Sequence, residues 1–439
     1  MNNNRKSLGQ LFFPIFLEIL LFMLTGAIDT LMLSSVGDQA VAAVGTANTY
    51  IGMFILMFSI ISSGMMAVMT QNIGAGKPGV AYQASKIGAA FNGALGLILG
   101  VILFFFGGTV LDIVGVAGAL KEPAEIYLKI VGGGCFLNAI IPIYSGYLRA
   151  FGFMKQPLVG TILANLTNLI LNAVFLYVFD MGVTGVAIAT IVSRIFNLVF
   201  VYIASRILIK AHDEASYLPI FHVLKQIVKI GLPSALETAL YNLAMTFIMR
   251  FLNQMDPDGF NVAARSYAST ITNFSFCAGA ALAQANAIIT GWNIGAEDYE
   301  SCKKGTRKAV IIGIIIAASI ETLFALSSDF IMSFFTDDLA LAALVKKLLF
   351  IDIALEIGRA ANLVYVNALK VSGDATFPVV MAVIFNFLCA VGGTYYFGIH
   401  LEMLAVGAYI GLALDECVRA VAMILRWRTG IWKTKRIVS

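Results

Sequence analysis

The sequence predicts an all-α polytopic membrane protein with about twelve transmembrane helices in two pseudo-symmetric six-helix bundles. The composition, the spacing of the apolar segments and an internal repeat predict this fold class. Of the 439 residues, 59% are hydrophobic and only 12% are charged, and the mean hydropathy is +0.88. Charged residues make up roughly a quarter of a typical soluble domain. A chain of this composition is therefore expected to lie in lipid.

The second half of the chain repeats the first. The motif FPIFLE at residues 13–18 returns as LPSALE at 232–237, and QNIGA at 71–75 returns as WNIGA at 292–296. Further on, Pro157 and Asn165 correspond to Pro378 and Asn386, and GVA at 185–187 corresponds to GAY at 407–409. The offset stays between 219 and 222 positions. Two homologous halves with an even number of helices each are typical of transporters whose repeats are parallel in the membrane.

Each half contains six apolar segments of spanning length. The expected spans are 11–34, 48–71, 86–108, 125–148, 157–178 and 182–209, then 223–252, 264–291, 307–330, 343–368, 378–398 and 404–427. The stretch between the two sets contains His212, Asp213, Glu214 and Pro219, and its polarity predicts a linker. The predicted organisation is an N-terminal lobe at 1–209, a cytoplasmic linker at 210–222 and a C-terminal lobe at 223–439.

The lysines and arginines predict the orientation. Most of the 29 fall in loops and helix ends on one side of the predicted spans, the side that also holds both termini. Positive charge accumulates on the cytoplasmic side of membrane proteins. We therefore expect a multi-pass protein of the cytoplasmic membrane with both termini in the cytoplasm.

The sequence carries no pattern typical of an enzyme. It has neither a Walker A loop nor an HExxH motif, and its five cysteines are scattered without paired spacing. No catalytic residues and no cofactor are expected. The net charge of +4 gives no reason to expect nucleic-acid binding. The expected partners are membrane lipid and small organic solutes, and the protein is expected to be a monomer.

Polar residues inside the first-half spans are the first functional candidates, because a buried ionisable group costs at least ~2.5–3.5 kcal/mol in a membrane. The first span carries Glu18, Thr25 and Asp29 on one helical face, and the fifth carries Asn165, Asn168 and Asn172 on another. Carboxylate and amide oxygens suit a small cation or a proton-switched hydrogen-bond cluster. The alternative is that the asparagines only join helices.

The second half has a different set of ionisable residues. Glu237 lies in the seventh span, and two further groups occur at helical spacing: Asp352, Glu356 and Arg359 in the tenth span, and Asp415, Glu416 and Arg419 in the last. Each group is consistent with a transport role or with an internal ion pair that stabilises the helix. Asp112 and Glu321 lie near span ends, where an interfacial position is expected.

Several segments together resemble the multidrug and toxic compound extrusion (MATE) family. They are Pro14-x3-Glu18 followed by IDTLM at 28–32 and AVAAVG at 40–45, LRAFG at 148–152, GVTGVAIAT at 182–190 and LKVSGD at 369–374. The resemblance covers nearly the whole chain, in order, in both halves.

The resemblance implies a secondary antiporter in which two six-helix lobes enclose a central cavity, exchanging Na⁺ or H⁺ for amphipathic organic cations by alternating access. It implies a cation or proton coupling site at Asp29, Asn168 and Thr190, with no metal beyond Na⁺ at Asp29. Asn172 stands where many members carry an aspartate, which removes one negative charge. Glu237 lies one turn before the place where some members keep a glutamate.

The residues leave three functional classes open. The first is the cation-coupled exporter, with coupling at Asp29, Asn168, Asn172 and Thr190, and with Glu18, Glu237, Asp352, Glu356 and Arg359 in the substrate cavity or in second-lobe coupling. The second is a lipid-linked sugar flippase of the same superfamily, which predicts a strongly cationic cavity although only Arg194, Arg359 and Arg419 lie within spans. The third is a passive channel, which would not require buried carboxylates.

Overall fold

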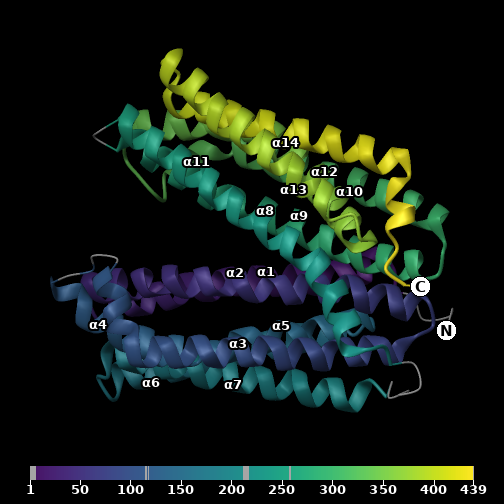
Figure 1. Ribbon diagram of the computed structural model, residues 1–439. Coiled ribbons are helices and arrows are strands. Elements are labelled where there is room, and N and C mark those ends of the chain that lie inside the picture. Colours follow the sequence, from purple (N-terminus) through teal and green to yellow (C-terminus); the bar gives the residue numbers. More distant parts are fainter. Residues whose placement is uncertain (1–5, 114–115, 117, 211–216, 257–258, 439) are drawn as a thin grey trace. The chain divides into compact units, whose positions relative to one another are not determined.

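The computed structural model describes residues 6–113, 116, 118–210, 217–256 and 259–438. Within these residues all regular secondary structure is helical (Figure 1). Residues 211–216 of the predicted linker lie outside the described residues. Contacts divide the chain into two compact units, one containing residues 17–232 and the other containing residues 7–16 and everything from Pro233 onward.

The first unit consists of long helices joined by short connections. They are α1 (Leu8–Ser34) from Leu17 onward, α2 (Asp38–Gly74), α3 (Pro78–Ile113), the short η2 (Gly118–Leu120), α4 (Lys121–Tyr127), η3 (Leu128–Gly132), α5 (Cys135–Ala150), α6 (Lys155–Tyr177), α7 (Gly182–Leu208) and α8 (Ile220–Met255) as far as Leu232. The predicted span 125–148 is broken into α4, η3 and α5, with a bend of 42°. The break coincides with three successive glycines, residues 132–134, which restrain the backbone least.

The second unit contains the remainder of α8 and the following helices. They are α9 (Phe260–Gly295), α10 (Tyr299–Leu326), α11 (Ser328–Met332), α12 (Leu339–Ser372), α13 (Thr376–Phe385), η5 (Asn386–Val391), η6 (Thr394–His400), α14 (Leu404–Thr429) and η7 (Ile431–Lys435). The predicted span 378–398 is interrupted, because η5 and η6 are wide π-helical turns. Such turns are rare and often occur at functional sites.

The division into units follows the sequence repeat. By contacts, α1 passes from one unit to the other between Phe16 and Leu17, and α8 does so between Leu232 and Pro233. Both points lie at the repeated motif that contains Pro14 and Pro233. Proline lacks the backbone N–H that continues a helical ladder. The lobe and linker boundaries expected from composition stay a prediction, and the contact boundary lies further along the chain than the predicted linker.

Eight helices in the described part of the chain are long and apolar enough to cross a membrane, and the bent pair Gly118–Gly132 with Cys135–Ala150 would make a ninth. The eight are Leu8–Ser34, Asp38–Gly74, Pro78–Asp112, Lys155–Tyr177, Gly182–Leu208, Phe260–Gly295, Tyr299–Leu326 and Thr376–His400. The helices α8, α12 and α14 are 36, 34 and 26 residues long but carry more polar residues. These three helices supply most of the second-unit ionisable groups described below.

The side-chain exposure and helix packing in each unit are typical of a membrane protein. Large apolar side chains remain exposed on the outer faces, among them Phe22, Phe105 and Leu323 at 78%, 68% and 63%. Helices approach each other closely at glycines that occupy corresponding positions in the two halves of the chain. A Cβ atom on Gly407 would lie 2.4 Å from the backbone nitrogen of Gly398, and one on the corresponding Gly185 would lie 2.7 Å from the Cβ of Phe175. Small residues permit such close contact between membrane helices.

Candidate functional site

In the first unit, α1 and α6 bring together the carboxylate and amides that the sequence singled out. The Nδ2 of Asn172 donates hydrogen bonds to the Oδ1 of Asp29 at 2.8 Å and to the Oδ1 of Asn168 at 3.2 Å. Asn172 is completely buried, Asn168 nearly so, and Asp29 is half-buried. The Oδ1 of Asn172 has no hydrogen-bond partner within the described part of the chain. The three side chains therefore present several oxygen atoms in one place, one of them unused.

Helix α7 contributes a hydroxyl and a positive charge to the same region. The Oγ1 of Thr190 donates to the carbonyl of Val186 at 2.8 Å, one turn earlier. The hydroxyl hydrogen is therefore used within α7, and the oxygen can still act as an acceptor or ligand. Four residues further along α7, Arg194 lies within electrostatic reach of Asp29 and Tyr127. Its Nη1 has no hydrogen-bond partner among the residues that the structure describes. No sequence pattern predicted that Arg194 lies near Asp29, because the two residues are far apart in the chain.

Glu18, the other first-span carboxylate, is paired with a cation of its own. The Nη2 of Arg149 on α5 donates to the Oε1 of Glu18 at 2.5 Å, and both side chains are largely buried. Asn165 instead donates to the backbone carbonyl of Leu21 at 3.3 Å. The first-unit candidates are thus divided between an ion pair near the start of α1 and the amide-bound Asp29 eleven residues later. Glu18 and the second-lobe candidates belong to different units.

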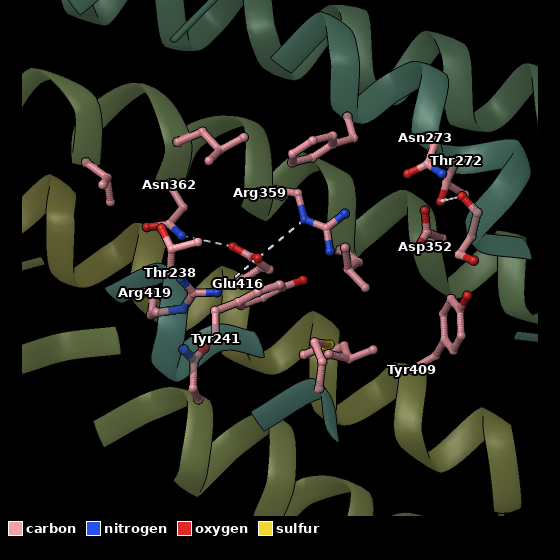
Figure 2. A pocket seen from close by; sticks show the side chains of 18 of the residues that line it. Thr238, Tyr241, Thr272, Asn273, Asp352, Arg359, Asn362, Tyr409, Glu416 and Arg419 are labelled. Atoms are coloured by element: carbon pink, nitrogen blue, oxygen red, sulfur yellow. Dashed lines mark hydrogen bonds and ion pairs between the residues drawn. The ribbon is translucent and has the colours of Figure 1, made fainter. Parts of the chain in front are cut away.

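A cavity of about 390 Å³ lies within the second unit, between α8, α9, α12, α14 and η5. Polar side chains and aromatic rings line it together, including Tyr241, Phe276 and Tyr409. Five of the predicted second-half candidates line it: Glu237, Asp352, Arg359, Glu416 and Arg419. Glu356 and Asp415 are not among the lining residues and reach the cavity only through their arginine partners. Figure 2 shows Arg359, Asn362 and Arg419 grouped around Glu416, with Asp352 and Tyr409 away from that group.

Glu416 is the centre of an ion network. Its Oε1 accepts from the Nε of Arg359 at 3.3 Å and lies 2.9 Å from the Nη2 of Arg419, and its Oε2 accepts from Asn362 at 2.9 Å. Each arginine also has an acid on its own helix, because Arg359 donates to Glu356 and Arg419 donates to Asp415 at 2.6 Å. In this network three carboxylates share two guanidinium groups, so the network is more acidic than basic.

Two more buried carboxylates lie near this network without a partner for every oxygen. Asp352 is 3% exposed, and its Oδ2 has no hydrogen-bond partner in the described residues. Glu321 on α10 is completely buried, and neither of its carboxylate oxygens has such a partner. Glu321 is therefore enclosed by protein, and its expected depth at the membrane interface stays a prediction. Helix α10, which carries Glu321, packs against α12 and α9.

Glu237 on α8 differs from the other cavity acids because it has a lysine partner. The Nζ of Lys370 on α12 lies 2.9 Å from its Oε2, and both side chains are mostly buried. Lys370 belongs to the LKVSGD segment at 369–374 and lies in the last turn of α12. Asp112, by contrast, is exposed and pairs with Lys121 at 2.5 Å, as its expected position near a helix end suggests.

These features are those of a polytopic membrane protein of two repeated helical units, with amide-bound carboxylates in the first unit and excess buried carboxylates in the second. The MatE family model matches residues 14–174 and 233–396, and the chain belongs to this family. It is therefore a multi-pass membrane transporter, and the predicted family and fold class are confirmed. Members of the family are transporters and not enzymes.

Two curated relatives are similar over almost their whole length. The chain is 33% identical to the uncharacterised transporter YisQ of Bacillus subtilis, over 98% of this chain and 95% of that protein. It is 22% identical to the probable multidrug resistance protein NorM of Thermotoga maritima, over 99% of this chain and 94% of that protein.

Solved structures agree on the fold. The chain aligns with a crystal structure of a MATE protein in the bent conformation, with a TM-score of 0.88 and 20% identity over 97% of this chain and 96% of the other. It also aligns with a mutant of the Vibrio cholerae MATE transporter VcmN, with a TM-score of 0.89 and 19% identity over 98% and 97% of the two chains. At these identities the likeness concerns the fold alone.

Proposed function

We propose that this protein is a cation-coupled antiporter that exports amphipathic organic cations by alternating access, with Na⁺ or H⁺ as the coupling ion. The state of Asp29 carries the proposal. Its carboxylate accepts a hydrogen bond from an amide at 2.8 Å, and no lysine, arginine or histidine of the described residues forms an ion pair with it. A carboxylate that is held in place but not neutralised is free to bind and release a cation or a proton.

The neighbourhood of Asp29 supports a coupling role. Asn168 and Asn172 add amide oxygens, and Arg194 adds a positive charge within electrostatic reach. Binding of a cation at Asp29 would raise the positive charge beside Arg194, so the two states of the site differ in electrostatic energy. Such a difference is what couples an ion gradient to a change between conformations. Thr190 is assigned to the same site because it lies one turn before Arg194 on α7.

The cavity of the second unit supports the substrate class. Its lining combines aromatic rings with a network in which acids outnumber arginines. Aromatic faces and excess negative charge suit a cationic solute that also has apolar surface. The name of NorM, a probable multidrug resistance protein, agrees with this class. We assign Glu237, Asp352, Glu356 and Arg359 to this cavity, and Glu18 to the support of the first unit through Arg149.

The flippase alternative fits the cavity less well. A lipid-linked sugar carries a pyrophosphate, which requires cations that are not already neutralised. Arg359 and Arg419 are each bound by two carboxylates. The passive-channel alternative gives no role to the carboxylates that both units bury.

We further propose that the protein lies in the cytoplasmic membrane as a monomer with both termini in the cytoplasm. The distribution of lysine and arginine supports this orientation. Modification of a single cysteine placed at Lys433, on intact cells and then on opened cells, measures it. Labelling only after opening is expected.

Transport by purified protein in proteoliposomes tests the proposed function. Efflux of a fluorescent organic cation is measured under a Na⁺ gradient alone, under a pH gradient alone, and after each gradient is dissipated by an ionophore. We expect one of the two ion gradients to drive transport of the dye against the dye's own concentration gradient. Dissipation of that ion gradient is expected to stop this transport. Fluxes that only equilibrate the dye, whatever the gradient, would mean a channel and would overturn the proposal.

A further inference from the structure

A second, smaller cavity lies wholly within the first unit, between α3, α5 and α7. Its volume is about 150 Å³, far above the ~10–15 Å³ that one water molecule requires. The side chains that line it share a chemistry, since all but one carry a hydroxyl or a positive charge: Tyr82, Ser85, Lys86, Tyr144, Tyr147, Tyr202, Ser205, Arg206 and Ile209. None of these described lining residues is an aspartate or a glutamate.

The floor of this cavity is buried and its rim is charged. Tyr82, Tyr147 and Ser205 are 7%, 2% and 1% exposed, whereas Lys86 and Arg206 are exposed. The Nη1 of Arg206 donates to the hydroxyl of Tyr82 at 2.5 Å, and the Nζ of Lys86 lies 4.5 Å from the centre of the Tyr82 ring. The two cations, from α7 and α3, are thus held beside one buried tyrosine.

One donor of the floor is left unused. The hydroxyl of Tyr147 is buried and has no hydrogen-bond partner among the described residues. A buried hydroxyl without a partner costs free energy, and most such groups in proteins are satisfied by a bound molecule or by the protein itself. Its ring is fixed by Tyr82 at 6.3 Å and by Phe151 at 5.1 Å between centroids, so it cannot turn away without loss of packing.

Apolar surface adjoins the rim. Ile203 and Ile207 follow Tyr202 and Arg206 directly on α7 and are 49% and 66% exposed. Side chains of this kind on a membrane helix face acyl chains. A ligand that reaches the cavity from there would have an anionic head and an apolar body. Basic pockets between membrane helices on the cytoplasmic side bind phosphate head groups of lipids.

From this juxtaposition of two cations, an unused tyrosine hydroxyl and adjoining apolar surface, we propose that the cavity binds the phosphate group of an anionic phospholipid. Lys86 and Arg206 hold the phosphate charge, and the Tyr147 hydroxyl donates to one of its oxygens. This site lies in the first unit and is separate from the second-unit substrate cavity. It holds a lipid that is not transported.

The test measures lipid binding by the full-length protein. Detergent-purified wild type is titrated with phosphatidylglycerol, with phosphatidylcholine and with inorganic phosphate, and bound molecules are counted by native mass spectrometry. We expect phosphatidylglycerol to bind, and the double variant Lys86→Gln with Arg206→Gln to bind it about tenfold more weakly or worse. Tyr147→Phe, which removes only the hydroxyl, is expected to weaken binding by a smaller factor.

Matched controls separate the cavity from general surface charge. Lys155→Gln with Lys225→Gln removes two exposed positive charges of the same unit outside the cavity, and Tyr177→Phe removes an exposed hydroxyl. Both controls are expected to bind phosphatidylglycerol as the wild type does. Equal loss in the paired lysine control, or unchanged binding in the Lys86 and Arg206 variant, would overturn the proposal. If inorganic phosphate binds by itself and displaces phosphatidylglycerol, the cavity is a site for free phosphate, and the proposal of a lipid ligand is overturned.

Discussion

Arg419 offers the sharpest test of the second-unit ion network, because its charged side chain is almost completely buried. Its side chain is 6% exposed and lies 2.6 Å from Asp415 and 2.9 Å from Glu416. Arg419→Gln would leave the 1% exposed Asp415 without a cation, and Glu416 with Arg359 alone. The loss of one partner of a buried pair typically costs ~3–5 kcal/mol of unfolding free energy.

The expected shift is large enough for a thermal assay. For a unit of about 200 residues, ~3–5 kcal/mol corresponds to a fall of roughly 6–20 °C in the unfolding temperature. Thermal unfolding in detergent, followed by the loss of the monodisperse peak in size-exclusion chromatography, measures this fall. The double variant Arg419→Gln with Asp415→Asn is expected to recover most of it, because Glu416 retains Arg359 and Asn362.

An exposed pair provides the control. Lys346 and Asp329 lie 2.5 Å apart with side chains 38% and 70% exposed, so Lys346→Gln should change stability by no more than ~1 kcal/mol. The network is not a set of desolvated ion pairs if Arg419→Gln unfolds at the wild-type temperature. The same conclusion follows if the double variant is no more stable than the single one.

Three further results are expected. Glu321→Gln should leave the unfolding temperature unchanged or raise it, because both oxygens of this buried acid lack partners, and a clear fall would mean that the carboxylate is bound. Gly407→Ala should destabilise the protein by ~1–3 kcal/mol in the same thermal assay, since its Cβ would meet the backbone of Gly398, whereas Gly305→Ala, where nothing lies within 4 Å, should not. Spin labels at Ser35 and Asn253 should give a distance distribution that substrate, Na⁺ or pH changes, and one fixed distribution in active protein would contradict alternating access.

Hydropathy and repeat spacing were sufficient to predict the helices, because twenty apolar residues have few alternatives in a membrane. They did not predict the bend before Cys135 or the π-helical turns from Asn386, which depend on local backbone geometry within an apolar stretch. Glycines at 132–134 were the available signal for the first of these.

Contacts within one helix were predictable and contacts between helices were not. The spacing of Glu356 and Arg359 indicated their pairing, and so did that of Asp415 and Arg419. The Arg149 partner of Glu18 and the Arg359 partner of Glu416 come from other helices, 131 and 57 residues away, and no periodicity connects them. Helical spacing did place Asn168 and Asn172 on one face, but only packing brings Asp29 to it.

The central claim, that Asp29 couples transport to an ion gradient, is tested most directly by active efflux from proteoliposomes that contain Asp29→Asn. Because a buried amide costs less than a buried carboxylate, the variant should insert and fold. The matched variant Asp112→Asn replaces an exposed acid of the same unit and should transport normally. We expect Asp29→Asn to bind the organic cation but no longer to move it against its concentration gradient. Gradient-driven efflux at the wild-type rate would contradict the central claim.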